Sequence, residues 1–145
     1  MKRFHFPLER VLRWRDGQAG LEELKLEQLR EGLAALGAQK RGIESERARS
    51  LEQVLHQPAV EATELHSLDA YRVHSRDQIR AIENREREAE AQVEQQRQRV
   101  IQARRDAELL ERLKQKARDA WQATSDREQE SLAGELYLAR RTRRR

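Results

Sequence analysis

The chain has 145 residues, of which 39% are charged and 37% hydrophobic, with two Phe, two Tyr, two Trp and no Cys. Alanine supplies much of the apolar fraction, so this composition excludes a compact globular core, and the absence of Cys excludes disulfides and thiolate metal sites. The formal net charge is +4, but the segment ARRTRRR holds five arginines, and without them the charge is 4 − 5 = −1. Basicity is therefore concentrated at the C-terminal end. Frequent Leu, Ala, Glu, Arg and Gln with few helix breakers are typical of long helices and coiled coils.

The first predicted element is a helix over residues 7–57. Apolar residues recur from Leu8 at alternating steps of four and three, the spacing of a coiled-coil seam. The seam positions are Leu8, Leu12, Arg15, Ala19, Glu22, Leu26, Leu29, Leu33, Leu36, Lys40 and Ile43. Beyond Ile43 the apolar pattern slips by one residue, which places Ala48, Leu51 and Leu55 on the predicted seam. Five glycines, Gly17, Gly20, Gly32, Gly37 and Gly42, weaken this helix, since each costs about 1 kcal/mol relative to Ala.

A bend is predicted over residues 58–63, because an interior proline, Pro58, ends or kinks a helix. The second helix is predicted over 64–138 with Thr63 as its cap, followed by a frayed basic tail over 139–145. Its seam positions are Leu65, Leu68, Arg72, Ser75, Ile79, Ile82, Glu86, Ala89, Val93, Gln96, Val100, Ala103, Ala107, Leu110, Lys114, Ala117, Trp121 and Thr124.

Two seams on either side of one short break predict an all-α fold, a long antiparallel two-helix coiled-coil hairpin with unequal arms in a single elongated domain. A bend near residue 60 places Leu8 opposite residue 112, so the end of the second helix has no partner helix. A parallel homodimer is the alternative arrangement.

The residues predict no catalytic, cofactor or metal site, and we expect a non-enzymatic protein. His56, His66 and His74 lack the spacing of a helical zinc pair, so solvated histidines are the simpler interpretation. The alternating Glu and Arg of ENREREAEAQVE are typical of a solvated, ion-paired helix face. No apolar run is long enough to span a bilayer, and we expect a cytoplasmic protein without membrane insertion.

The candidate partner-binding residues lie near the two ends of the chain. Phe4 and Phe6 precede Pro7 and either staple the start of the first helix or contact a partner. Arg13 and Trp14 follow them; Trp14 either begins the seam or contacts a partner. On the second helix the candidates are Trp121, Arg127, Leu132 and Leu136, placed on the predicted overhang, where exposed apolar side chains indicate a partner surface or a homodimer contact.

The N-terminal pattern Arg3-Phe4, Phe6, Leu8-Glu9, Val11-Leu12 and Arg15 resembles that of the flagellar export protein family FliJ. A second match lies in LLERLKQKARDAWQATSDREQESLAGEL, at Glu111-Arg112-Leu113-Lys114, Lys116, Trp121, Arg127-Glu128 and Leu132. With the helix–break–helix organisation, the resemblance covers essentially the whole chain. Gly17, Gly20 and a bend with few aromatic residues depart from the family pattern.

The resemblance implies a stalk protein similar to the central stalk of rotary ATPases, with its termini in the pore of the hexameric flagellar export ATPase. It further implies ATPase ring assembly, contacts with the membrane export gate protein and with export chaperones, and a place at the flagellar base beside the inner membrane. A basic-tailed nucleic-acid-binding coiled coil and a structural scaffold are the alternatives. The first is disfavoured because a zipper-type DNA binder needs a basic region that directly continues a dimeric seam.

Overall fold

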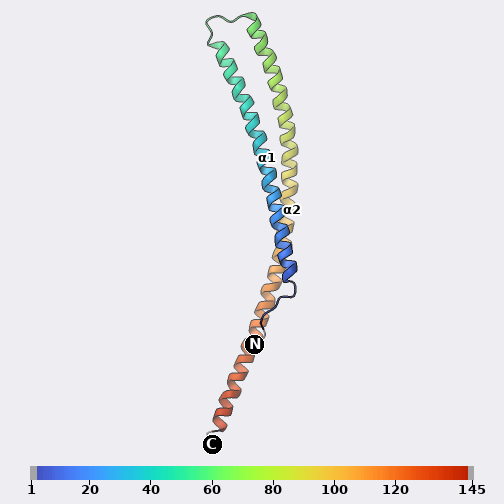
Figure 1. Ribbon diagram of the computed structural model, residues 1–145, viewed down its shortest axis with the longest axis vertical. Coiled ribbons are helices and arrows are strands. Elements are labelled where there is room, and N and C mark those ends of the chain that lie inside the picture. The colour runs from blue at the N-terminus through green and yellow to red at the C-terminus, as the bar shows by residue number, and fades with distance from the viewer. Residues whose placement is uncertain (1–2, 144–145) are drawn as a thin grey trace. The chain divides into compact units, whose positions relative to one another are not determined.

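The computed structural model describes residues 3–143 and contains two helices, α1 (Glu9–Leu55) and α2 (Ala62–Thr142), of 47 and 81 residues. The predicted all-α helical hairpin is confirmed: two long helices are joined by one bend, and the described residues form no strand (Figure 1). Packing divides it into a terminal unit, Met1–Gly20 with Ile101–Arg145, and a bend unit, Leu21–Val100.

The start of α1 follows the chemistry of proline. Pro7 lies in a turn, the amide of Glu9 donates to the carbonyl of Phe6 at 3.2 Å, and regular helical bonds begin with Leu12 donating to Leu8 at 2.9 Å. Glu9 then places its carboxylate in the first turn, where the helix dipole favours negative charge. The helix therefore starts two residues after the position predicted from Pro7.

The bend lies between Leu55 and Ala62, because the residue before Pro58 cannot easily continue a helix. α2 begins two residues earlier than predicted, since Glu64 rather than Thr63 supplies the cap. The amide of Glu61 donates to Oε2 of Glu64 at 3.2 Å, which is half of a capping box.

The predicted frayed tail is wrong for residues 139–142, because α2 continues to Thr142. The hydroxyl of Thr142 donates to the carbonyls of Leu138 and Ala139, at 3.3 and 3.0 Å, one turn earlier on the helix. Arg140 and Arg141 lie in the last turn, where cations interact favourably with the helix dipole. Arg144 and Arg145 lie outside the described residues.

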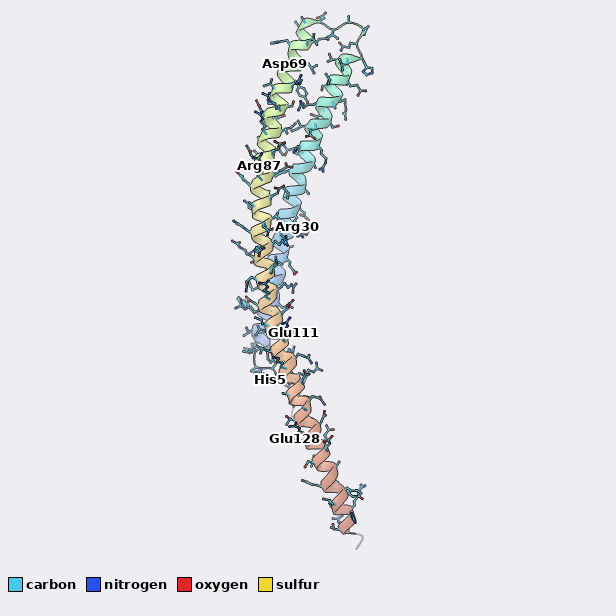
Figure 2. All side chains as sticks on the ribbon, turned by 180° about the vertical axis from the view of Figure 1, so that it is seen from behind. His5, Arg30, Asp69, Arg87, Glu111 and Glu128 are labelled. Carbon is cyan, nitrogen blue, oxygen red and sulfur yellow. The ribbon has the colours of Figure 1, made fainter. Side chains whose placement is uncertain are left out.

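In the bend unit the helices run antiparallel, because α1 residues farther from the bend contact α2 residues farther from the bend. Lys40 Nζ lies 3.2 Å from Glu83 Oε1 and 3.6 Å from Glu86 Oε2, and Gln96 Nε2 donates to the carbonyl of Glu22 at 3.0 Å. Arg30 of α1 and Arg87 of α2 are labelled on these neighbouring helices in Figure 2.

The same pairings explain the polar residues of the predicted seam. Glu22 and Gln96 are seam positions on opposite helices and bond to each other, as do Lys40 and Glu86. These polar pairs fix one alignment of the helices, because any shift along the axis separates them.

The predicted slip after Ile43 is wrong. Arg47, Ser50 and Val54 are half-buried and continue the four–three spacing, whereas Leu51 and Leu55 are exposed. The unbroken repeat keeps the same face of α1 against α2, even though this face includes the charged side chain of Arg47 and the hydroxyl of Ser50. Contact with α2, rather than the apolarity of single residues, decides which face is covered.

In the terminal unit the two helices are aligned as the sequence predicts. Lys114 Nζ lies 3.0 Å from Glu9 Oε2, which agrees with the predicted placement of Leu8 opposite residue 112. Leu12, Ala19 and Ala107 are buried between the two helices.

Candidate partner-binding surfaces

The N-terminal residues before α1 pack onto α2. Phe6 is buried, with 7% of its surface exposed, and the ring centroids of Phe4 and Trp121 lie 5.9 Å apart with the planes tilted by 54°. An inclined pair of this kind is a favourable aromatic arrangement. Phe4, Phe6 and Trp121 therefore hold the N-terminal segment against α2, and Trp121, predicted to be uncovered, is half-buried.

Ion pairs join the two helices of the terminal unit on one side. Glu9 pairs with Lys114, and Asp16 Oδ1 accepts from Arg104 Nη1 at 3.2 Å. The hydrogen bond from Lys114 is the largest cause that lowers the pKa of Glu9 from its ordinary value of 4.5. Charged residues, among them Glu108 and Glu111, line a hollow on this side. We call this polar surface the ion-paired side of the terminal unit.

The remaining N-terminal candidates are exposed. Arg13 lies 3.7 Å from Glu9, one turn earlier on α1, in a surface ion pair that contributes little to stability. Trp14 is 57% exposed, which excludes it from the seam. The guanidinium carbon of Arg15 lies 5.1 Å from the centroid of the Trp14 ring, a cation–π contact that orients the indole without covering it.

The last part of α2 extends past the N-terminal segment. Ser125 is buried, whereas every described residue from 126 to 143 is exposed. Figure 2 labels Glu128 on this part of α2, where no second helix lies beside it. We call residues 126–142 the distal segment.

The distal segment combines apolar side chains with a basic end. Arg127 and the predicted pair Leu132 and Leu136 lie here, each of them exposed. Leu132 and Leu136 are four residues apart and so share one face of the helix. Tyr137, which was not among the predicted residues, is 66% exposed and lies one residue beyond Leu136. Tyr137 lines a shallow hollow with Arg140, Arg141 and Arg143.

The structure thus separates the eight predicted residues. Three of them, Phe4, Phe6 and Trp121, hold the N-terminal segment against α2, and we call these three the clamp. Arg13 lies on the ion-paired side. Trp14 stands on another side of the terminal unit, and Arg127, Leu132 and Leu136 are on the distal segment. Sequence reasoning missed Leu109 and Leu113, both exposed on α2. Their position one residue before a seam residue was the available signal.

Among residues 3–143, no group of three or more His, Asp or Glu side chains is arranged to hold a metal ion. Within the same range, no helix contains an apolar stretch long enough to cross a bilayer. The chain matches no protein-family profile, no curated protein and no solved structure, so the resemblance to the flagellar export family stays a prediction.

Proposed function

We propose that this chain is a non-enzymatic coiled-coil stalk or adaptor protein of the flagellar type III export apparatus, and that its terminal unit binds the hexameric export ATPase. In this proposal it acts in the cytoplasm at the flagellar base and couples the ATPase to the export gate and to export chaperones. The resemblance of both ends to the FliJ family names the system. The exposed distal segment is the observation that supports binding through this end.

The distal segment supports a protein partner for a physical reason. Leu132, Leu136, Tyr137 and Leu138 are each about 60% exposed on a helix that no other described element covers. Burying one such side chain stabilises a complex by roughly 1.5–3 kcal/mol, so a partner would gain most from the leucines. The neighbouring arginines would accelerate association with an acidic partner and make it sensitive to salt.

A ring-assembly and pull-down assay with the cognate flagellar export ATPase tests the proposal. The intact chain should bind the ATPase and increase its ring formation and ATP hydrolysis. The double variant Leu132→Ala/Leu136→Ala should weaken binding at least tenfold. Leu21→Ala/Leu24→Ala is the matched control, because it removes two leucines of similar exposure from the bend unit, and it should bind as the parent does.

Failure of the parent chain to bind the ATPase, with ATP hydrolysis unchanged, would refute the proposal. Removal of residues 140–145 tests the nucleic-acid alternative. DNA affinity that falls steeply with salt and disappears with this truncation would favour that alternative.

A further inference from the structure

A second uncovered surface lies on the terminal unit, apart from the distal segment. Five large apolar residues remain exposed although α1 and α2 are paired here, and we call them the apolar face: Leu8, Val11, Trp14, Leu109 and Leu113.

Four of these residues each precede a seam residue, and Leu8 lies three residues before Val11, so the helix repeat places all five on one side of the helix pair. Consecutive residues differ by about 100° around a helix, so residues that precede and follow a seam position point to opposite sides. Asp16 directly follows the seam residue Arg15, and Arg104 directly follows the seam residue Ala103. Asp16 and Arg104 form an ion pair. Residues that follow the seam therefore meet on the ion-paired side.

Residues that precede the seam must meet on the opposite side. Val11 precedes Leu12, and Leu113 precedes Lys114. The Glu9–Lys114 ion pair and the Arg15–Asp106 ion pair bracket this stretch, so Val11 and Leu113 lie at nearly the same level on their two helices.

Trp14 and Leu109 extend this side outward. Trp14 lies three residues after Val11, and Leu109 lies four residues before Leu113, so each shares a helix face with its helix's member of the central pair. Trp14 is also held in place, because the Arg15 guanidinium that lies over its ring donates to Asp106 of α2 at 3.2 Å. The apolar face is thus assembled by both helices and includes an oriented aromatic side chain.

The charges around the apolar face are mostly positive. Arg10, Arg105 and Lys116 flank it by helical spacing, and the structure gives none of them an ion pair within the described residues. The carboxylates on this side are already engaged: Asp106 accepts from Arg15, and Asp119 accepts from Gln115 at 2.8 Å. An apolar centre therefore lies within a rim of cations for which the described residues supply no ion-pair partner.

We propose that the apolar face is a docking site for a helix of another protein, one with an apolar stripe flanked by Asp or Glu. A third helix laid along the pair would contact Val11 and Leu113 centrally and Trp14 and Leu109 at the edges, as in a local three-helix bundle. Acidic flanks would neutralise the rim. A second copy of this chain is disfavoured as occupant, because symmetric pairing would bring the two cationic rims together.

This inference is independent of the proposed function, and its test does not use the export ATPase. The probe is a displayed library of helical peptides with an apolar stripe and flanks that vary between Glu, Ser and Lys, screened against the full chain. Selection should enrich Glu-flanked sequences. Replacing their flanks with Lys should weaken binding at least tenfold.

Two variants locate the site. Trp14→Ala/Leu113→Ala removes one exposed side chain from each helix and should weaken peptide binding at least tenfold while helicity by circular dichroism is unchanged. Leu51→Ala/Leu55→Ala is the matched control, because it removes two exposed leucines near the bend, and it should change binding less than twofold.

Four outcomes would overturn the proposal. They are no enrichment, enrichment of Lys-flanked peptides, binding that the Trp14/Leu113 variant leaves unchanged, and a competing occupant. A competing occupant would be revealed by self-association in sedimentation, or by binding to phosphatidylglycerol vesicles, that the same variant abolishes.

Discussion

Replacing two glycines of the bend unit by alanine should stabilise the hairpin. Gly32 and Gly42 lie inside α1, and no heavy atom lies within 4 Å of the position that a Cβ would occupy at either residue. An alanine therefore fits without displacing a neighbour. The gain comes from helix propensity and from the lower entropy of the unfolded chain.

The magnitude follows from the helix geometry. Each substitution should stabilise by about 1 kcal/mol, the difference between Gly and Ala in a helix interior. The two positions are separated by about 15 Å along the helix, so their effects should add to about 2 kcal/mol. With a urea dependence of roughly 1–3 kcal/mol per molar, the unfolding midpoint should rise by about 0.7–2 M.

Urea unfolding followed by circular dichroism at the helix band measures this shift. Ala38→Gly is the matched control, because it makes the reverse change at an exposed position between the two glycines and should lower the midpoint by a comparable amount per residue. A double variant whose midpoint stays the same or falls would refute the reasoning, since it would show that these glycines serve a contact that alanine disturbs.

Three further outcomes are expected. Phe4→Ala removes the ring that contacts Trp121, so the indole NMR resonance of Trp121 should shift toward that of an exposed tryptophan and the docked segment should lose about 0.5–1.5 kcal/mol; an unshifted resonance would contradict the clamp. Gln96→Ala removes the hydrogen bond that is the largest cause lowering the pKa of Glu22, so a carboxyl NMR titration should show that pKa rising toward 4.5. A carboxylate with a lowered folded-state pKa contributes stability that is present above its unfolded pKa and is lost as the pH falls through the folded value, so the loss of stability on acidification below about pH 4.5 should be smaller in this variant. Lys40→Met removes the ammonium group whose hydrogen bond with Glu83 raises the pKa of Lys40. The stability that this pair contributes is complete below pH 10.5 and declines as the pH rises through the folded-state pKa of Lys40. The free energies of unfolding of parent and variant should therefore differ less in strong alkali than at neutral pH.

Helical periodicity made most of the fold predictable. Every predicted seam position of α1 from Leu12 to Ile43 is buried or half-buried, and Pro58 located the bend to within a few residues. A helix repeats its environment every turn, so a local pattern carries information over many residues. The polar residues within that pattern were also informative, since Glu22 and Gln96 proved to be partners.

The candidate surfaces were less predictable because exposure depends on what the other helix covers. Trp121 resembles an exposed contact residue in the sequence, yet it packs against Phe4, a residue 117 positions away in the chain (121 − 4). Leu51 and Leu55 are as apolar as true seam residues, but the alignment with α2 leaves them exposed.

The sequence alone determined two long helices, a break near residue 60 and a basic end, because these depend on local spacing, proline chemistry and charge. Only the tertiary structure decided which apolar residues stay uncovered. Val11 and Leu113 form one surface because the pairing of α1 with α2 sets their levels, and a pairing between distant segments is not encoded in either segment by itself.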